Sequence, residues 1–494
     1  MRFRAAALLP AFLTVLLPAC YGADPSLTIY NQRFAVIRET IPLDLKQGVN
    51  AIQFEGVTAL VEPQSVMLRD PAGQRVLRIL DQNYRADPVS MDALLTRYEG
   101  QTIEFQVRMG DKTEVVSGKI VRASAPAGMD AMAGRPQQPQ PIVEVGGKLQ
   151  FGLPGTPLFP GLGAGMILKP VLEWTVETSR AGRLDAELAY VSGGLNWSAD
   201  YNIVSGDGNA LDIIGWVTME NRSGKQFENA RVKLMAGDVN KIQPQFAGGG
   251  GREMFQATAG LMTSGQGGPA VEEKSFDEYH LYTLQRPVTI HDKETKQVEF
   301  VRADGVKSEV VYIYDGMKVD STRYRGWNPD QVRNDMNYGT LSNNKVWVMR
   351  EFVNSNANHL GMPLPKGRVR FYRRDTDGRL EFTGEDSIDH TPKDERIRVF
   401  TGAAFDLNGE RKRTVSLNDM GRRTIDEGFE IKVRNHKKER AEVRVVEHLY
   451  RGTTWDITTS SVPWVKNDSQ TIEFRVMLNP DEEKAITYTA HYTW

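Results

Sequence analysis

The segment Ala485-Ile486-Thr487-Tyr488-Thr489-Ala490-His491-Tyr492-Thr493-Trp494 alternates apolar and polar side chains without a break. A strict period of two is the signature of a β-strand, because successive side chains point to opposite faces. One face would carry Ile486, Tyr488, Ala490, Tyr492 and Trp494, and the other Thr487, Thr489, His491 and Thr493. A strand that is buried on one face and wet on the other is typical of an antiparallel sandwich.

The neighbouring sequence predicts two hairpins. Thr471–Leu478 precedes this strand across the turn Asn479–Lys484. Further upstream, Phe429–Val433 and Ala441–Val445 flank the charged turn Asn435–Arg440, with Phe429, Ile431, Val433, Ala441, Val443 and Val445 on the inward face. Two alternating runs joined by a short polar turn favour antiparallel pairing of the two strands.

The same alternation recurs through most of the chain. It appears in Leu172–Val176, Leu184–Val191, Leu211–Met219 and Asn344–Phe352. Two short helices are expected, one over 90–98 capped by Ser90 or Asp92, and one that begins after Asn328 with Pro329 at its first position. The predicted fold class is all-β: a multi-domain protein of antiparallel β-sandwiches, with a small barrel-like unit and few short helices.

The N-terminus has the pattern of a secretory signal peptide over residues 1–22. Arg2 and Arg4 precede an apolar run from Ala5 to Leu17, and small residues follow near Cys20. The run has 13 residues, whereas a helix needs about 20 to span a bilayer. No later stretch approaches that length, so we expect an exported protein with no transmembrane helix in the mature chain.

Cys20 is the only cysteine, and two processing routes are open for it. Leu17-Pro18-Ala19-Cys20 resembles a bacterial lipobox, in which the cysteine is lipidated and becomes the first mature residue. Cleavage after Gly22 or Ala23 would instead discard the thiol. The protein is thus expected in the periplasm or, if lipidated, anchored to the outer membrane. Neither route leaves a disulfide in the mature chain.

Shifts in composition predict the domain boundaries. We expect an N-terminal β-domain over 27–87, a barrel-like unit over 94–151 and a Gly/Pro-rich linker over 152–165. The remainder, 166–494, forms a large β-region that divides into two sandwiches near 316–343 and contains a flexible loop over 243–271, where Gly248–Gly251 is unbroken.

The charge balance excludes some partners. A net charge of −2 over 494 residues offers no field for nucleic acid or anionic lipid. The densest basic segment, Lys366–Arg374, alternates so that Val369 and Phe371 face one way and Arg368 and Arg370 the other. This indicates a solvated strand face. No cofactor or metal site is expected, since none of the motifs for zinc, nucleotide phosphates or a serine nucleophile occurs.

Seven segments together resemble an uncharacterised family of exported proteins known as domain of unknown function 4139, which is distantly similar to the mucoidy inhibitors. They are Tyr190–Tyr201, Gly215–Gly224, Ala236–Asn240, Phe276–Leu284, Leu360–Gly367, Gly384–Pro392 and Gly402–Asp406. The resemblance covers about Leu172 to Trp494. It implies a β-protein of the envelope or the secreted fraction, with a hint of surface polysaccharide and no specific biochemistry.

Three tryptophans have two interpretations. Trp174, Trp197 and Trp216 lie in alternating segments, where core packing is the leading interpretation because each ring can bury a large apolar area. The alternative is that one or two of them face outward and stack against sugar rings as a ligand-binding platform.

One cluster has catalytic potential. Glu385, Asp386, Asp389 and His390 could bring two carboxylates and an imidazole together for general acid and base chemistry in glycoside cleavage, or for calcium. The spacing does not match an EF-hand loop. Capping of a turn and pairing with Lys393 or Arg396 is the leading interpretation.

The sequence therefore favours a non-enzymatic envelope protein that binds surface polysaccharide or an envelope protein. A carbohydrate-active enzyme that uses carboxylates of 385–389 is one alternative. An assembly scaffold whose edge strands pair with neighbours is another.

Overall fold

The computed structural model describes residues 25–85, 90–110, 112–123, 140–161, 167–206, 208–237, 239–241, 271–276 and 279–494. The predicted signal peptide with Cys20 lies outside the described residues. So do residues 162–165 of the expected linker and nearly all of the expected loop over 243–271.

The all-β fold class is confirmed. Strands make up most of the described residues, in several multi-strand antiparallel sheets, and the only α-helices among these residues are α1 (Met91–Arg97) and α2 (Pro329–Asn334). Two single turns of 3₁₀-helix, η1 (Pro63–Ser65) and η2 (Asn356–Asn358), complete the helical content there. Within the described ranges no helix is both long and apolar enough to cross a membrane.

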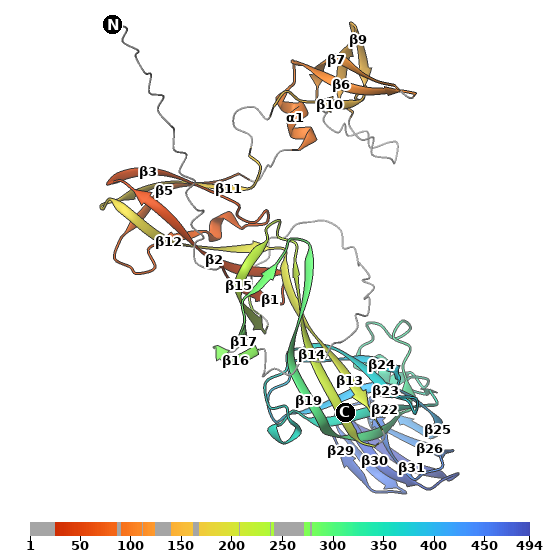
Figure 1. Ribbon diagram of the computed structural model, residues 1–494. Helices are drawn as coiled ribbons and strands as arrows, with labels where there is room; N and C mark the ends of the chain where they lie inside the picture. Colours follow the sequence, from red (N-terminus) through yellow and green to blue (C-terminus); the bar gives the residue numbers. More distant parts are fainter. Residues whose placement is uncertain are drawn as a thin grey trace, which may run out of the picture. The chain divides into compact units, whose positions relative to one another are not determined.

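The chain forms two compact units (Figure 1). Unit 1 comprises Met1–Asn196, Glu220–Lys233 and Pro287–Thr295, and unit 2 comprises Trp197–Met219, Leu234–Arg286 and Lys296–Trp494. The unit boundaries therefore do not follow the order of the sequence, because strands from several separate stretches contribute to each unit.

Unit 1 contains two sheets built from early and late strands. One has the order β3-β11-β5, with β3 (Gly48–Glu55), β11 (Val171–Thr178) and β5 (Leu77–Arg85). In the other, β1 (Ser26–Tyr30), β2 (Phe34–Leu45), β12 (Gly182–Gly193) and β4 (Met67–Arg69) are successive neighbours, and β15 (Phe227–Ala236) extends it beside β1 and pairs with β18 (Val288–Ile290). The strands expected to open the large β-region at 166 pair instead with N-terminal strands.

The segment expected to be barrel-like is an open sheet, so that part of the prediction is wrong. Its order is β10-β6-β7-β8-β9, with bounds Thr156–Leu158, Thr102–Met109, Lys112–Arg122, Ile142–Val145 and Lys148–Phe151. No pairing joins β10 to β9 among the described strands. Instead, Leu95 and Tyr98 at α1 cover one face around Phe105, which buries the apolar side chains without closure.

Unit 2 is built on a sheet of 13 strands. Its main order is β24-β23-β13-β14-β19-β22-β25-β26-β31-β28, with bounds Leu380–Ile388, Gly367–Arg374, Leu195–Ser205, Ala210–Asn221, Glu294–Asp315, Lys345–Val353, Arg396–Asp419, Thr424–Asn435, Glu483–Thr493 and Trp455–Ser460. β27 (Ala441–His448) pairs with β19 and with β30 (Thr471–Leu478), which pairs with β29 (Trp464–Lys466). A hairpin of β16 (Val271–Phe276) and β17 (Tyr279–Leu284) also belongs to unit 2.

The C-terminal part of this sheet folds over a shared core. Side chains of β26 and β31 meet those of β27 and β30 in one buried cluster. Ten of the eleven side chains predicted to face inward here belong to this cluster, and the eleventh, Trp494, packs against it. Both predicted hairpins are wrong, however. β26 pairs with β25 and β31, whereas β27 pairs with β19 and β30, so each turn carries the chain from one layer to the other.

Asn435 explains why these turns cross between layers. Its buried Nδ2 donates to the carbonyl oxygens of Glu439 at 2.9 Å, Asn479 at 3.0 Å and Leu478 at 3.4 Å. One amide therefore satisfies backbone acceptors of both connecting turns, in a place where they would otherwise be buried without partners.

The sheet is continuous across 316–343, where a division into two sandwiches was expected. β19 and β22 on either side of this segment pair directly, with Ile313 opposite Trp347. The segment is therefore an insertion, with a two-stranded ribbon of β20 (Met317–Lys318) and β21 (Leu341–Ser342) at its base. α2 begins as predicted, with Asn328 as its N-cap in a reciprocal capping box with Gln331.

Candidate functional site

Two of the three candidate tryptophans are core residues. Trp174 in β11 and Trp197 in β13 are each 2% exposed. The Nε1 of Trp174 donates to Gln82 Oε1 at 2.8 Å, and that of Trp197 donates to the Met235 carbonyl oxygen at 3.1 Å. Neither ring has a face available to a sugar, so the core-packing interpretation fits both.

Trp216 differs from the other two. It is half-buried in β14, in register with Ile214 and Thr218 on the less buried face of that strand. Thr218 Oγ1 donates to Asp200 Oδ2 at 3.2 Å, and Asp200 forms an ion pair with Arg370 at 3.7 Å. Trp216 thus lies on a polar sheet face, as a single ring without a second aromatic partner among the described residues.

The structure separates the two adjacent carboxylates of the predicted catalytic cluster. Glu385 in β24 forms ion pairs with Arg370 at 3.3 Å and Arg368 at 3.7 Å on the neighbouring strand. Asp386 accepts a hydrogen bond from the Phe400 backbone N–H at 2.6 Å. Because successive side chains of a strand point to opposite faces, these carboxylates do not converge.

The remaining two members serve the turn after β24. The Asp389 carbonyl oxygen accepts from Thr391 Oγ1 at 2.8 Å, and His390 Nδ1 accepts from the Lys366 backbone N–H at 3.2 Å. No group of three or more His, Cys, Asp or Glu side chains in the described ranges is placed to hold a metal. Hydrogen bonds to backbone groups and ion pairs thus account for this segment, but the predicted partner Arg396 pairs with Glu351, and the ion pairs of Glu385 are with Arg368 and Arg370 instead.

A different site emerges from the insertion at residues 316–343, which we call the aromatic insertion. Four half-buried rings form a chain that we call the aromatic cluster: Trp327, Tyr324, Tyr338 and Tyr450. Ring centroids lie 4.8 Å apart from Trp327 to Tyr324, 4.8 Å from Tyr324 to Tyr338 and 5.2 Å from Tyr338 to Tyr450. The first two contacts are edge-to-face, a geometry favoured by the ring quadrupoles.

Two rings of the cluster, Tyr324 and Tyr450, also contact cationic groups. The Arg323 guanidinium lies 5.1 Å from the Tyr324 ring centroid and also forms an ion pair with Asp335 at 3.7 Å. The Arg451 guanidinium lies 5.1 Å from the Tyr450 ring. These cation–π contacts restrict the rings to defined orientations.

Buried arginines of the sandwich hold the aromatic insertion in place. Arg411 in β25 is fully buried, and its Nη1 donates to the Gly339 carbonyl oxygen at 2.7 Å. Its Nε donates to both oxygens of Glu447, at 2.8 and 3.0 Å, and its guanidinium stacks 3.9 Å from the Phe429 ring. The same arginine therefore joins the insertion to the core.

Arg451 makes a second anchor. Its Nη1 donates to the carbonyl oxygens of Asp335, at 2.8 Å, and Val332, and its Nη2 donates to buried Glu427 at 2.9 Å. Each guanidinium has five donors in a rigid fork. Arginine can therefore satisfy a buried carboxylate and loop carbonyls at the same time.

The buried charges have shifted titration. Burial raises the pKa of the Tyr488 hydroxyl far above its ordinary value, and Glu447, which accepts a 2.5 Å hydrogen bond from it, raises it further. Burial alone would lower the pKa of Arg411, but Glu447 outweighs it and the pKa rises. Tyr488 thus stays protonated and Arg411 stays charged. Because Arg411, Glu447 and Tyr488 are enclosed, this buried group of side chains stabilises the structure and is not placed to react with a substrate.

The rings of Trp327, Tyr324 and Tyr338 are half-buried and held in fixed orientations by one another, whereas the hydroxyl of Tyr450 is buried. A rigid aromatic surface binds the apolar face of a planar or ring-shaped ligand at little cost in conformational entropy. These rings were not predicted as a site: 316–343 was expected to be a boundary between two sandwiches, with one short helix after Asn328. The signal was present in Tyr324-Arg325-Gly326-Trp327-Asn328 and in Tyr338, aromatic residues concentrated in a long connection between strands.

No protein-family model matches the chain, and no match was found among curated proteins. The resemblance to domain of unknown function 4139 therefore stays a prediction, and the geometry of the site carries the functional argument.

Proposed function

We propose that this chain is an exported, non-enzymatic protein of the bacterial envelope that binds surface polysaccharide. The aromatic cluster on the aromatic insertion is the observation that supports it. Loops on a rigid β-scaffold commonly carry binding residues, since the scaffold fixes their position while the loop sequence is free to vary.

The chemistry of the cluster suits a sugar chain. A pyranose ring presents C–H groups on one face, and a tyrosine or tryptophan ring packs against that face while its O–H or N–H remains available for hydroxyl groups. Trp327 and Tyr324 supply a larger and a smaller ring in edge-to-face contact. Several neighbouring rings would engage successive sugar units of one chain.

The alternative of a carbohydrate-active enzyme based on 385–389 receives no support from geometry. Glycoside cleavage needs two carboxyl groups that flank one bond, whereas Glu385 is paired with arginines and Asp386 caps a backbone N–H. The assembly-scaffold alternative has no specific observation in its favour.

A binding assay with matched variants tests the proposal. The purified protein would be titrated with polysaccharide from the surface of its own source cells, with W327A and Y324A beside W347A as a control aromatic outside the cluster. We expect W327A and Y324A to weaken binding at least tenfold and W347A to leave it within twofold. Equal affinity of all four proteins would contradict the proposal.

A further inference from the structure

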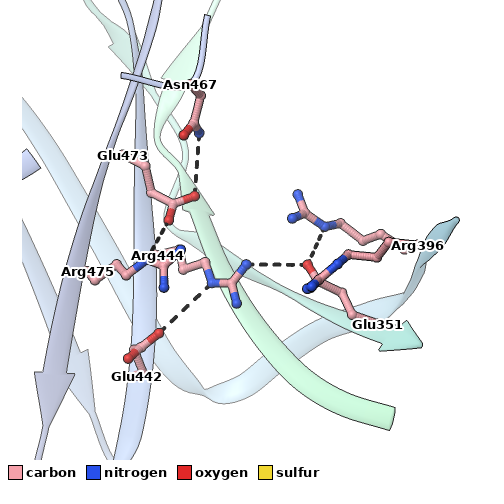
Figure 2. Close-up of polar contacts among 8 residues, drawn as sticks. Glu351, Arg396, Glu442, Arg444, Asn467, Glu473 and Arg475 are labelled. Carbon is pink, nitrogen blue, oxygen red and sulfur yellow. Dashed lines mark hydrogen bonds and ion pairs between the residues drawn. The ribbon is translucent and has the colours of Figure 1, made fainter. Parts of the chain in front are cut away.

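A second polar arrangement in unit 2 surrounds Glu351 of β22. Its side chain is 2% exposed and accepts hydrogen bonds from three guanidinium groups (Figure 2). Arg396 Nη1 donates to Oε2 at 2.9 Å, while Arg398 Nε at 2.5 Å and Arg444 Nη1 at 3.3 Å donate to Oε1. One buried carboxylate thus fixes three arginines.

The sheet register produces this convergence. Arg398 of β25 lies directly opposite Glu351, and Arg396 lies opposite Val353, two residues along the same face. Arg444 comes from β27, which pairs with β19 on the other side of β22. The three side chains therefore come from strands on both sides of Glu351, on one face of the sheet.

The charges around Glu351 do not balance. Three guanidinium groups contact one carboxylate, and the next acidic group, Glu442, lies 4.0 Å from Arg444. Glu473 is occupied by Arg475 at 3.0 Å and by Asn467 (Figure 2). The three arginines therefore carry one positive charge more than the two carboxylates, Glu351 and Glu442, that contact them.

Glu309 is the remaining acidic neighbour. It lies opposite Glu351 in β19 and is exposed. Within the described part of the chain it forms no ion pair with these arginines at 4 Å or less. Glu309 therefore does not hold any of these guanidinium groups in an ion pair.

Unused donors face solvent. The side chains of Arg396 and Arg398 are 61% and 46% exposed, and among the described residues Glu351 is the only ion-pair partner of each. A guanidinium has five N–H donors, so most of theirs are open. Arg444 Nε is buried without a hydrogen-bond acceptor within the same ranges.

We propose that Arg396 and Arg398 form a binding site for an oxyanion, and, resting on the proposed function, that this oxyanion is the carboxylate of uronic acid units in an acidic polysaccharide. A guanidinium group binds a planar carboxylate through two parallel N–H···O bonds. Arg396 and Arg398 place two such groups next to each other, so the site suits a carboxylate ligand. Glu351 orients both forks before the ligand arrives, which lowers the entropic cost of binding.

Titration calorimetry with an acidic and a neutral polymer tests this. The full chain and R396Q/R398Q would be titrated with polygalacturonate and with dextran, at 50 and 200 mM salt. R422Q is the matched control, since Arg422 is an exposed arginine paired with Asp419. We expect R396Q/R398Q to bind polygalacturonate at least tenfold more weakly than wild type or R422Q, with a smaller salt dependence.

A lysine variant guards against misfolding. R396K/R398K keeps the charge and loses the fork, so we expect it to fold normally by circular dichroism and to bind polygalacturonate with intermediate affinity. Wild-type affinity in R396Q/R398Q would overturn the site while the proposed function stands. No binding of polygalacturonate by the wild type would overturn the inference about uronic acids, whereas the titration with polysaccharide from the source cells decides the proposed function separately.

The phosphate of a lipid headgroup is the competing oxyanion source. Vesicles containing phosphatidylglycerol provide this arm of the experiment. Loss of vesicle binding in R396Q/R398Q, together with unchanged polygalacturonate binding, would assign the arginines to lipid and overturn the inference. Unchanged vesicle binding in the variant, with weakened polygalacturonate binding, supports it.

Discussion

Arg411 of β25 and Glu447 of β27 form a fully buried ion pair with two N–H···O contacts, 2.8 and 3.0 Å long. Such a pair adds little net stability, because desolvation of both ions opposes their attraction. Its effect here is to specify one arrangement, since Arg411 also holds the Gly339 carbonyl of the aromatic insertion.

Removal of one charge of the Arg411–Glu447 pair should strongly destabilise the protein. E447Q leaves the buried Arg411 charge without its carboxylate, and we expect it to lower the free energy of unfolding by about 3–5 kcal/mol. Urea unfolding followed by circular dichroism measures this. The double variant R411M/E447L, which removes both charges, should lose less than E447Q alone. A single variant as stable as wild type would show that the pair is not enclosed in solution.

Gly409 should not tolerate a methyl group. A Cβ at this position would lie 2.1 Å from the Tyr314 ring, so we expect G409A to destabilise the protein by about 1–3 kcal/mol through overpacking. Tyr314 also donates to the Asn343 carbonyl at the end of the aromatic insertion. G452A is the control, because nothing lies within 4 Å of that Cβ position. Thermal unfolding of both variants would compare them directly.

Substitution of a core tryptophan should mainly lower stability, whereas substitution of a tryptophan in the aromatic cluster should mainly weaken ligand binding. W174A removes a buried ring and its hydrogen bond to Gln82, and should cost about 3–5 kcal/mol of stability. W327A, in a half-buried position, should cost far less and should weaken ligand binding instead. Denaturation midpoints measured beside glycan affinity would test this, and a larger loss of stability in W327A would contradict it.

His448 should make stability depend on pH. Its hydrogen bond to Asp315, 2.9 Å long, raises the pKa of the imidazole above its ordinary value of about 6.5, although burial opposes this. A raised folded-state pKa stabilises the fold below the unfolded value, and the contribution disappears as pH rises through the folded value.

The size of this effect is limited by solvent. The His448 side chain is 39% exposed, so we expect under about 1 kcal/mol. H448Q should be less stable than wild type at pH 5.5 and equal to it at pH 9, in chemical unfolding at both pH values. D315N should show the same loss at pH 5.5. A difference that persists unchanged at pH 9 would exclude the charged pair as its cause.

The sequence predicted which face of each strand is buried but not which strand is its neighbour. Tyr488 and Phe429 were both placed inward, and both lie in the core, because alternation alone determines the face. Pairing depends on whether a turn reverses within a sheet or crosses between layers. Two of the three bonds of Asn435, which joins both crossing turns, reach residues 43 and 44 positions away.

The candidate site shows the same limit. Trp174 and Trp327 are indistinguishable by residue type, and only the surrounding strands bury the first and leave the second accessible. Likewise Glu351, Arg398 and Arg444 are distant in sequence, and cross-strand register alone brings them together. Local signals were read correctly where a contact is local, as in the cap of α2 by Asn328.

The crossing turns also affect how the chain folds. A hairpin can form by itself in microseconds, as β25 and β26 can across residues 420–423, but β26 and β27 do not pair with each other. β27 must wait for its partner β19, which lies more than 100 residues earlier in the chain. Such non-local pairing predicts folding in milliseconds to seconds, with apolar strands exposed to other molecules for that interval, and hence a requirement for dilute conditions or a chaperone during refolding.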